Sequence, residues 1–186
     1  ILEDYSRYFI DGLYAESFAE GLLALERNWR GSLLTNNTVD ETLRRFQILE
    51  KAASPQNLRN WRFQQSLFRA YDDSYDHHRL VAETKLEKEA LDELQQAKTK
   101  GSLNAITAAE KILARPSTEP VQAAKRIRLV ELAEALFQSI GMQLSVEKYK
   151  AIAVDRGASL DTLDYPLNNR RWLNHRFAEI RTLGSE

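Results

Sequence analysis

The stretch from Pro55 to Lys98 constrains the fold more than any other part of the sequence, because it predicts one very long helix. After Pro55, neither Gly nor Pro occurs until Gly101. Ser54 can cap the first turn, and Pro is well tolerated at the first helical position. A residue with positive φ, most often Gly, commonly follows a helix end, which suits Gly101. At about 1.5 Å per residue this helix would extend roughly 65 Å, far beyond the width of a small domain.

The apolar residues of this stretch recur on one side of the predicted helix. They follow one another at steps of seven and then of four residues: Trp61, Phe68, Tyr75, Ala82, Leu86, Ala90 and Leu94. Such spacing places side chains on one helix face, which must be covered to be stable in water. We therefore expect shorter helices to pack against it.

Six further segments have helical spacing of their apolar residues: 4–26, 38–54, 102–114, 121–140, 145–152 and 168–180. No run alternates between apolar and polar residues as a half-buried strand would. We predict an all-α fold, an irregular bundle of six or seven helices around one long central helix. At 186 residues the chain suits a single domain covering positions 1–186.

Local patterns add predictions about helix ends and packing. Thr38 and Glu41 have the spacing of a capping box, and Ser102 can cap the helix that follows Gly101. Gly12 and Gly21 lie inside the predicted 4–26 helix, where the absence of a side chain lets a neighbouring helix approach closely. The side chains expected to point inward outside the long helix include Tyr5, Phe9, Leu13, Phe18, Leu22, Leu25, Trp29, Leu33, Leu43, Phe46, Ile48, Leu49, Leu129, Leu136, Trp172 and Phe177.

The composition argues against several functional classes. A net charge of −1 gives no general attraction for nucleic acid or for an anionic membrane, so we expect neither as a partner. No apolar run approaches the roughly 20 residues that span a bilayer. Cysteine is absent, and no phosphate-binding loop, dinucleotide glycine pattern, nucleophile elbow or zinc spacing occurs. The sequence thus predicts no cofactor and no catalytic residue.

Two clusters of titratable residues could bind a metal ion or act as an acid and a base, but each can also be explained as part of a solvated surface. Asp73 and His77 are four residues apart and could share a metal ion on one helix face. Helical di-metal sites, however, use Glu-x-x-His pairs, and no His here has an acid three residues before it. We interpret this region as a solvated, charge-mixed face. Four glutamates could supply a general acid and base, but surface positions are commoner for them: Glu16, Glu20, Glu131 and Glu134.

The segment from Asp155 to Asp164 is the strongest candidate for a ligand contact. It lacks helical spacing, and long structureless loops in compact domains are often functional. The residues we single out are Asp155, Arg156, Asp161 and Asp164, with Arg170 at the start of the next helix. The alternative is a strap held down by its apolar residues. The arginines of the last helix are interpreted as side chains that cover a buried Trp172.

Two stretches carry a resemblance to known proteins. They are Leu23–Leu33 (Leu-Ala-Leu-Glu-Arg-Asn-Trp-Arg-Gly-Ser-Leu) and Glu131–Ile140 (Glu-Leu-Ala-Glu-Ala-Leu-Phe-Gln-Ser-Ile), with the latter running on to Trp172. They resemble a helical segment of large, exported bacterial multidomain proteins of uncharacterised function, which continue into a β-rich region of carbohydrate-binding type. The resemblance implies a module without catalytic residues, in a periplasmic or extracellular parent protein that handles polysaccharide or glycoconjugate.

Two hypotheses follow for the function. The first is a non-catalytic helical module that packs against neighbouring domains of a parent chain or against a protein partner. The start at Ile1, with Met142 as the sole methionine, fits a segment of a larger protein. The second is that the chain forms one wall of a carbohydrate-active site. A packing module should expose a large apolar patch, whereas a site wall should have a cleft where carboxylates, arginine and an aromatic ring converge.

Overall fold

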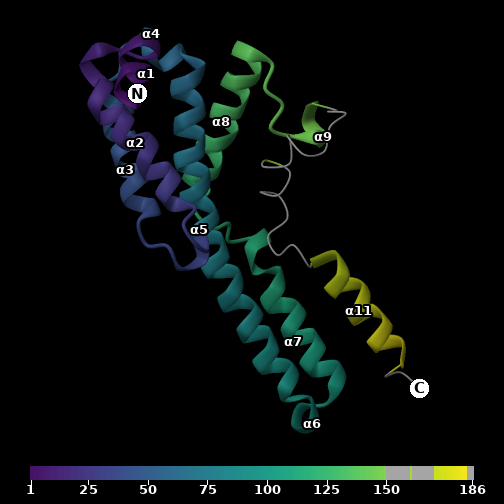
Figure 1. Ribbon diagram of the computed structural model, residues 1–186. Helices are drawn as coiled ribbons and strands as arrows, with labels where there is room; N and C mark the ends of the chain where they lie inside the picture. Colours follow the sequence, from purple (N-terminus) through teal and green to yellow (C-terminus); the bar gives the residue numbers. More distant parts are fainter. Residues whose placement is uncertain (150–159, 161–169, 184–186) are drawn as a thin grey trace. The chain divides into compact units, whose positions relative to one another are not determined.

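The computed structural model describes residues 1–149, 160 and 170–183, and all the secondary structure in them is helical (Figure 1). The α-helices are α1 (Leu2–Phe9), α2 (Ala15–Asn28), α3 (Val39–Ala52), α4 (Pro55–Arg59), α5 (Trp61–Gln95), α6 (Ala97–Lys100), α7 (Ser102–Ala114), α8 (Ala123–Ile140), α9 (Val146–Tyr149) and α11 (Arg170–Leu183). The predicted all-α class is confirmed for these residues, among which no strand occurs. The chain divides into two compact units, residues 1–78 with 122–161 and residues 79–121 with 162–186.

The long helix exists, but it begins six residues later than predicted and ends at Gln95 instead of Lys98. Ser54 accepts a hydrogen bond from a backbone N–H, as expected, yet this cap starts the short α4. Asn60 then adopts an extended conformation and ends α4. Its side-chain amide donates to the carbonyl of Phe9 at 2.5 Å, and its Oδ1 accepts the N–H of Arg62 at 3.0 Å. Asn60 therefore ends one helix, caps the next and fixes the end of α1.

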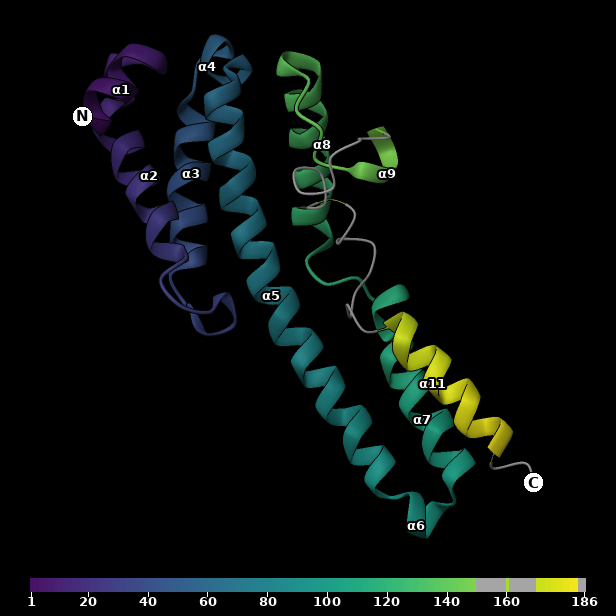
Figure 2. The ribbon, with the colours of Figure 1, turned by 45° about the vertical axis from the view of Figure 1, so that its right-hand side comes forward.

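The first unit is built from α2, α3 and the first part of α5, which run alongside one another (Figure 1 and Figure 2). At its centre the Phe18 ring meets Phe46 edge-on at 5.9 Å and stacks on Phe63 at 5.7 Å. The buried α5 residues of this unit are Phe63, Gln64, Ser66, Leu67, Phe68, Ala70, Tyr71, Asp73, Ser74 and Tyr75. They occupy more than one helix face, so the single predicted stripe understates how fully this part of α5 is covered.

Helix α8 completes this unit and runs antiparallel to α5. Near its start, Lys125 Nζ donates to Ser74 Oγ at 2.7 Å, and near its end Ser139 Oγ donates to Gln64 Oε1 at 3.4 Å. Arg128 pairs with Glu50 of α3 at 2.5 Å. The predicted inward residues Leu129 and Leu136 of α8 are buried. Helix α8 thus contacts both α3 and α5.

The helix ends predicted from glycine are confirmed, whereas the side-chain caps predicted at Thr38 and Ser102 do not form. Gly101 and Gly141 have positive φ, +85° and +68°, as their positions after a helix predict. The predicted capping box is wrong: the Thr38 backbone is already helical and its hydroxyl donates to Asn36 Oδ1 at 2.7 Å. Ser102 is the first residue of α7 and makes no cap hydrogen bond.

The predicted 4–26 helix is interrupted. The Asp11 carboxylate accepts the N–H of Leu13 at 2.9 Å and starts a 3-10 turn, Gly12–Tyr14, between α1 and α2. Spacing counted across this break loses its meaning, so Leu13 is 80% exposed rather than buried. Ile48 of α3 is also exposed, against expectation. The interruption leaves α1 as a separate short helix beside α2.

Gly21 behaves as predicted, and Gly12 does not. Gly21 lies inside α2, where an added Cβ would meet the Cζ of Phe46 at 2.9 Å. Gly12 lies in the 3-10 turn, and a Cβ there would make only an ordinary contact. Close packing of α3 against α2 therefore depends on Gly21.

The second unit has a separate core. Its buried cluster comprises Ala90, Ile106, Ala109, Leu113 and Phe177, contributed by the last part of α5, by α7 and by α11. Phe177 is buried as predicted, whereas Trp172 is 65% exposed, so the interpretation of arginines covering a buried Trp172 is wrong. Instead, Arg181 of α11 pairs with Glu110 of α7.

Candidate functional site

The ligand-contact residues predicted from the sequence lie outside the part of the chain that the structure describes. This applies to Asp155, Arg156, Asp161 and Asp164. Arg170 is the first residue of α11, but its side chain is likewise outside the described part. The choice between a strap and a contact site therefore stays a prediction.

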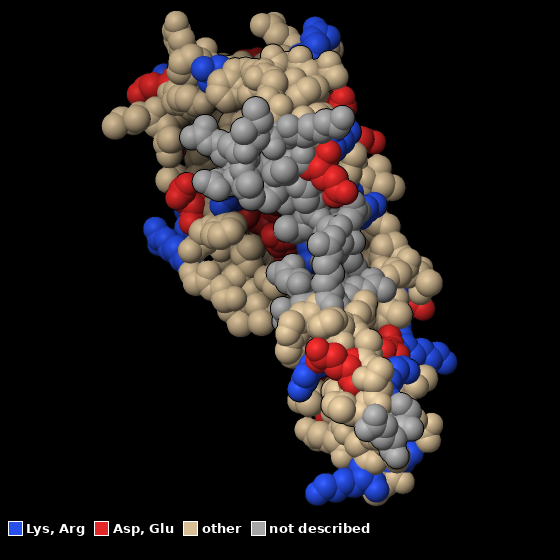
Figure 3. All heavy atoms as spheres, turned by 90° about the vertical axis from the view of Figure 1, so that its right-hand side faces the viewer, with Lys and Arg blue, Asp and Glu red and all other residues tan. Residues whose placement is uncertain are grey.

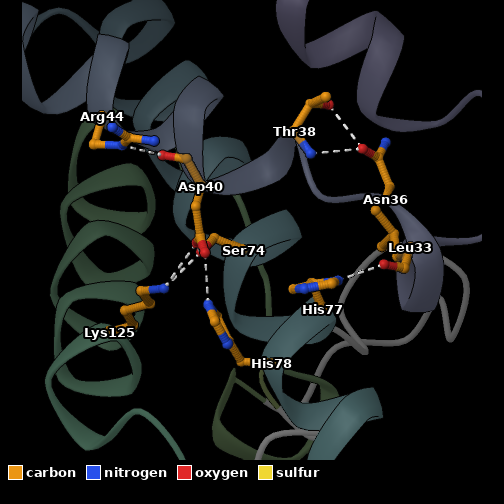
Figure 4. Close-up of polar contacts among 9 residues, drawn as sticks. All are labelled: Leu33, Asn36, Thr38, Asp40, Arg44, Ser74, His77, His78 and Lys125. Atoms are coloured by element: carbon orange, nitrogen blue, oxygen red, sulfur yellow. Dashed lines mark hydrogen bonds and ion pairs between the residues drawn. The ribbon is translucent and has the colours of Figure 1, made fainter.

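A polar network joins three helices of the first unit around Asp40 (Figure 4). Asp40 lies in the first turn of α3 and accepts a 2.5 Å hydrogen bond from Ser74 of α5. His78 Nε2, one turn further along α5, lies 2.8 Å from Asp40 Oδ2. Lys125 Nζ of α8 donates to Ser74 Oγ at 2.7 Å and to Asp40 Oδ1 at 3.2 Å. Residues far apart in sequence thus converge on one carboxylate.

The electrostatics of this network indicate that it holds helices together. Partial burial alone would raise the pKa of Asp40, but its hydrogen bonds and the charge of Lys125 outweigh it and lower the pKa to about 2. Ser74 resembles a serine beside a lysine base, yet it has no exposed surface. Because a nucleophile must touch its substrate, this serine cannot attack one. The arrangement stabilises the contacts among α3, α5 and α8.

A second network surrounds Asp73, which was predicted to lie on a solvated face and is in fact 1% exposed. Its carboxylate accepts hydrogen bonds from Asn28 Nδ2 at 2.9 Å, Trp29 Nε1 at 2.9 Å and Arg69 Nε at 2.8 Å. The guanidinium of Arg69 also lies 4.6 Å from the centre of the Trp29 ring. These contacts explain how Trp29 anchors the turn after α2 while remaining 55% exposed, contrary to the prediction of burial.

The hypothesis that Asp73 and His77 share a metal ion is not supported by their contacts. His77 Nδ1 lies 2.6 Å from the carbonyl oxygen of Leu33, which is buried as predicted. Asp73 has three other partners. Among the residues that the structure describes, no group of three His, Cys, Asp or Glu side chains could hold a metal ion.

Asp72 of α5 carries a carboxyl group whose pKa is strongly raised. Burial raises its pKa to about 8, and the nearby carboxylates of Asp76 and Asp73 act in the same direction. The charge of Arg69 opposes them only partly. Asp72 is therefore mostly protonated in the folded protein at neutral pH.

A cleft of about 400 Å³ lies among α1, α2 and α5 in the same unit. It is lined by Leu2, Tyr5, Leu22, Leu25, Glu26, Arg62, Gln65, Ser66 and Arg69. Its leucines give it an apolar part, and its arginines, its carboxylate and its amide give it polar groups. No residue of this cleft was predicted to form a site.

Next to the cleft is a continuous group of rings, which we call the aromatic–arginine surface: Tyr5, Tyr8, Phe9, Trp61 and Arg62. Phe9 lies 5.0 Å from Tyr5 and 4.8 Å from Tyr8 between ring centres. The guanidinium of Arg62 lies 4.2 Å from the Phe9 ring and 4.3 Å from the Trp61 ring. Tyr8 is 83% exposed, and Arg62 forms no ion pair with a described side chain. The surface thus combines exposed aromatic area with an available positive charge.

The sequence contains a signal for this surface that periodicity hides. Tyr5, Tyr8 and Phe9 give the eight-residue α1 three aromatic side chains, more than its packing against α2 uses. Trp61 and Arg62 join them because Asn60 ties the start of α5 to the end of α1. That tertiary contact is not encoded in any local spacing.

On the face drawn in Figure 3, acidic and basic side chains are interspersed among the coloured residues. No helix in the described part of the chain combines the length and the apolar character needed to cross a membrane.

Comparisons with protein-family models, with curated proteins and with solved structures find no match. The resemblance to exported bacterial multidomain proteins therefore stays a prediction. Function has to be inferred from the clefts, networks and surfaces of the described residues.

Proposed function

We propose that the chain is a non-catalytic helical module, organised around α5, that binds a partner protein or a neighbouring domain through the aromatic–arginine surface and its cleft. The observation that supports this most directly is the exposure of Tyr8, 83%, within a continuous cluster of aromatic rings. An isolated exposed apolar residue is ordinary, but a contiguous group with a cleft beside it marks an interaction surface.

The composition of the surface fits a recognition role. Tyr, Trp and Arg are the residues most enriched among those that contribute most to binding energy. Their positions are also fixed before binding, since Phe9 contacts both Tyr5 and Tyr8, and Arg62 lies against Phe9 and Trp61. Side chains that are ordered in the free protein lose less conformational entropy on association.

The cleft defines the chemistry of the partner. Its leucines, Leu2, Leu22 and Leu25, can accept one apolar side chain. Arg62, which lines the cleft, can form a charge-assisted hydrogen bond with a carboxylate, because it forms no ion pair with a described side chain. The best occupant is a protein segment that places an apolar side chain next to Asp or Glu.

This proposal is tested by selecting peptides from a display library of random twelve-residue sequences on the immobilised chain. Selected peptides should share an apolar residue adjacent to Asp or Glu. Their affinity should fall about tenfold or more for Arg62→Gln, because a hydrogen bond to a charged group contributes roughly 1.5–3 kcal/mol. Tyr8→Ser should weaken binding as well.

The matched control is Ile48→Ser, which removes an exposed apolar side chain that belongs to neither the cleft nor the aromatic–arginine surface. It should leave the affinity of the selected peptides unchanged. Peptides without the expected pattern, or binding that Arg62→Gln does not weaken, would contradict the proposal. Circular dichroism of each variant establishes that the helices are retained.

A second candidate function, carbohydrate binding, is favoured by the polar side of the same cleft. Glu26, Gln65 and Arg62 can hydrogen-bond sugar hydroxyls, and Tyr5 offers an aromatic ring. An array of oligosaccharides distinguishes the two functions. Saturable binding of a glycan that is lost in Tyr5→Ala and Glu26→Gln, with no peptide selected, would replace the protein partner by a carbohydrate.

A further inference from the structure

A second cleft lies in the first unit, formed by the end of α2, the loop that follows and the start of α3. Its volume is about 630 Å³. Its lining includes Arg27, Arg30, Ser32, Asn37, Glu41 and Arg45. It shares no lining residue with the cleft beside the aromatic–arginine surface. Its function is therefore independent of the one proposed above.

The charge of this cleft is strongly one-sided. Three arginines, Arg27, Arg30 and Arg45, face a single carboxylate, Glu41. Arg45 pairs with Glu41 at 3.0 Å and with Glu20 at 3.5 Å, which fixes its guanidinium. Arg27 and Arg30 form no ion pair with a described side chain. Two guanidinium groups are thus available to an anion.

The loop that lines this cleft is polar and is held by its own hydrogen bonds. Asn36 Nδ2 donates to the carbonyl of Asn28 at 2.9 Å, and Asn36 Oδ1 accepts the N–H and the hydroxyl of Thr38 at 2.9 and 2.7 Å. Ser32 Oγ accepts the N–H of Leu34 at 3.3 Å. The loop is held by its own hydrogen bonds, so a ligand would not have to order it.

We propose that this cleft binds a phosphate or sulfate ester, with Arg27 and Arg30 contacting the oxyanion. A guanidinium donates two parallel hydrogen bonds to such groups, and the three terminal oxygens that both esters share can accept hydrogen bonds from two guanidinium groups at once. The volume exceeds that of a free phosphate ion and leaves room for the organic group that the ester carries. Polar side chains of Ser32 and Asn37 line that remaining space.

Isothermal titration calorimetry of the whole chain tests this, at constant ionic strength set with sodium chloride. The probes are glucose 6-phosphate, glucose 6-sulfate, inorganic phosphate and glucose. At least one ester should bind saturably, and glucose should not. Comparison of the two esters assigns phosphate or sulfate, and inorganic phosphate alone should bind more weakly than the preferred ester.

Variants establish where the ester binds. Arg27→Gln and Arg30→Gln should each weaken binding about tenfold or more. Arg44→Gln removes the same charge from a residue of α3 that does not line the cleft, and it should have no effect. Absence of saturable binding by either ester overturns the proposal. Equal weakening by Arg44→Gln, or no weakening by Arg27→Gln and Arg30→Gln, overturns it as well, provided that circular dichroism shows each variant folded.

Discussion

Replacement of Gly21 by alanine should destabilise the protein, although the same change usually stabilises a helix. Gly21 lies inside α2, where an added Cβ would lie 2.9 Å from Cζ of Phe46 and 3.2 Å from a second ring atom. Ordinary contacts of a Cβ begin near 3.4 Å. The ring cannot easily retreat, because Phe46 is fully buried and meets Phe18, which in turn stacks on Phe63.

The magnitude follows from two opposing effects. Alanine in place of an interior helical glycine contributes about 1 kcal/mol of helix stability. Forcing an extra methyl group into a packed core costs about 1–3 kcal/mol, and the ring stack behind Phe46 places this site toward the upper end. The net loss in the free energy of unfolding should be about 1–2 kcal/mol. For a chain of this size, that lowers the melting temperature by roughly 2–8 °C.

A double-mutant cycle separates the two effects. In the Phe46→Leu background the smaller side chain leaves room for a Cβ, so Gly21→Ala should there stabilise the protein by up to about 1 kcal/mol. The coupling energy between the two positions should therefore be about 2 kcal/mol or more. The control is Gly12→Ala, which meets no close neighbour and should be neutral or slightly stabilising.

Urea unfolding followed by tryptophan fluorescence measures these differences. Trp172 belongs to the second unit, so a Trp172→Phe background restricts the signal to Trp29 and Trp61 of the first unit. If Gly21→Ala stabilises the protein equally with and without Phe46→Leu, the close approach of α2 and α3 is refuted.

Three further outcomes are expected. Trp29→Phe, which keeps an aromatic side chain but removes the N–H donated to Asp73, should cost about 1 kcal/mol in urea unfolding; an unchanged midpoint would show that this bond contributes nothing. Asp72→Asn should stabilise the protein increasingly between pH 4 and pH 8, by up to about 1.4 kcal/mol per pH unit, because the raised pKa of Asp72 makes its ionisation unfavourable in the folded state; parallel pH profiles of the two proteins would contradict this. Lys125→Met should lower the free energy of unfolding at pH 7 by about 1 kcal/mol, allowing for the partial exposure of Asp40. Since the low pKa of Asp40 makes its contribution disappear as pH falls from 4 to 2, the difference caused by Lys125→Met should shrink over that range, and a constant difference would exclude Asp40 as the cause.

The sequence was a good guide wherever one physical rule dominates. Helical spacing identified the all-α class and the buried Phe18 and Phe46. Apolar side chains three or four residues apart lie on one face of a helix, and that face is buried as a whole. Gly101 and Gly141 end helices for the steric reason that predicts them. These features depend on residues within a few turns of one another.

Local spacing failed to predict helix ends where a side chain had two possible hydrogen-bond partners and bonded to the one that the spacing did not indicate. Thr38 has the right spacing for a capping box, yet its hydroxyl bonds to Asn36, and the box does not form. Asn60 carries no helix-breaking signal as strong as Pro or Gly, but its bond to Phe9 ends α4. The first competition is decided within the loop and the second by a tertiary contact, and the spacing of apolar residues reports neither.

The surfaces proposed for binding arise from this same competition. Asp11 and Asn60 interrupt helices that the apolar pattern would have continued, and Phe9, predicted to point inward, is exposed at the end of α1. The Asn60 bond then brings Arg62 against Phe9, a contact between residues on separate helices. A continuous 4–26 helix would have placed Phe9 in the same inward stripe as Phe18, away from the guanidinium of Arg62. The breaks that defeat sequence-based prediction of the helices are therefore what create the candidate recognition surface.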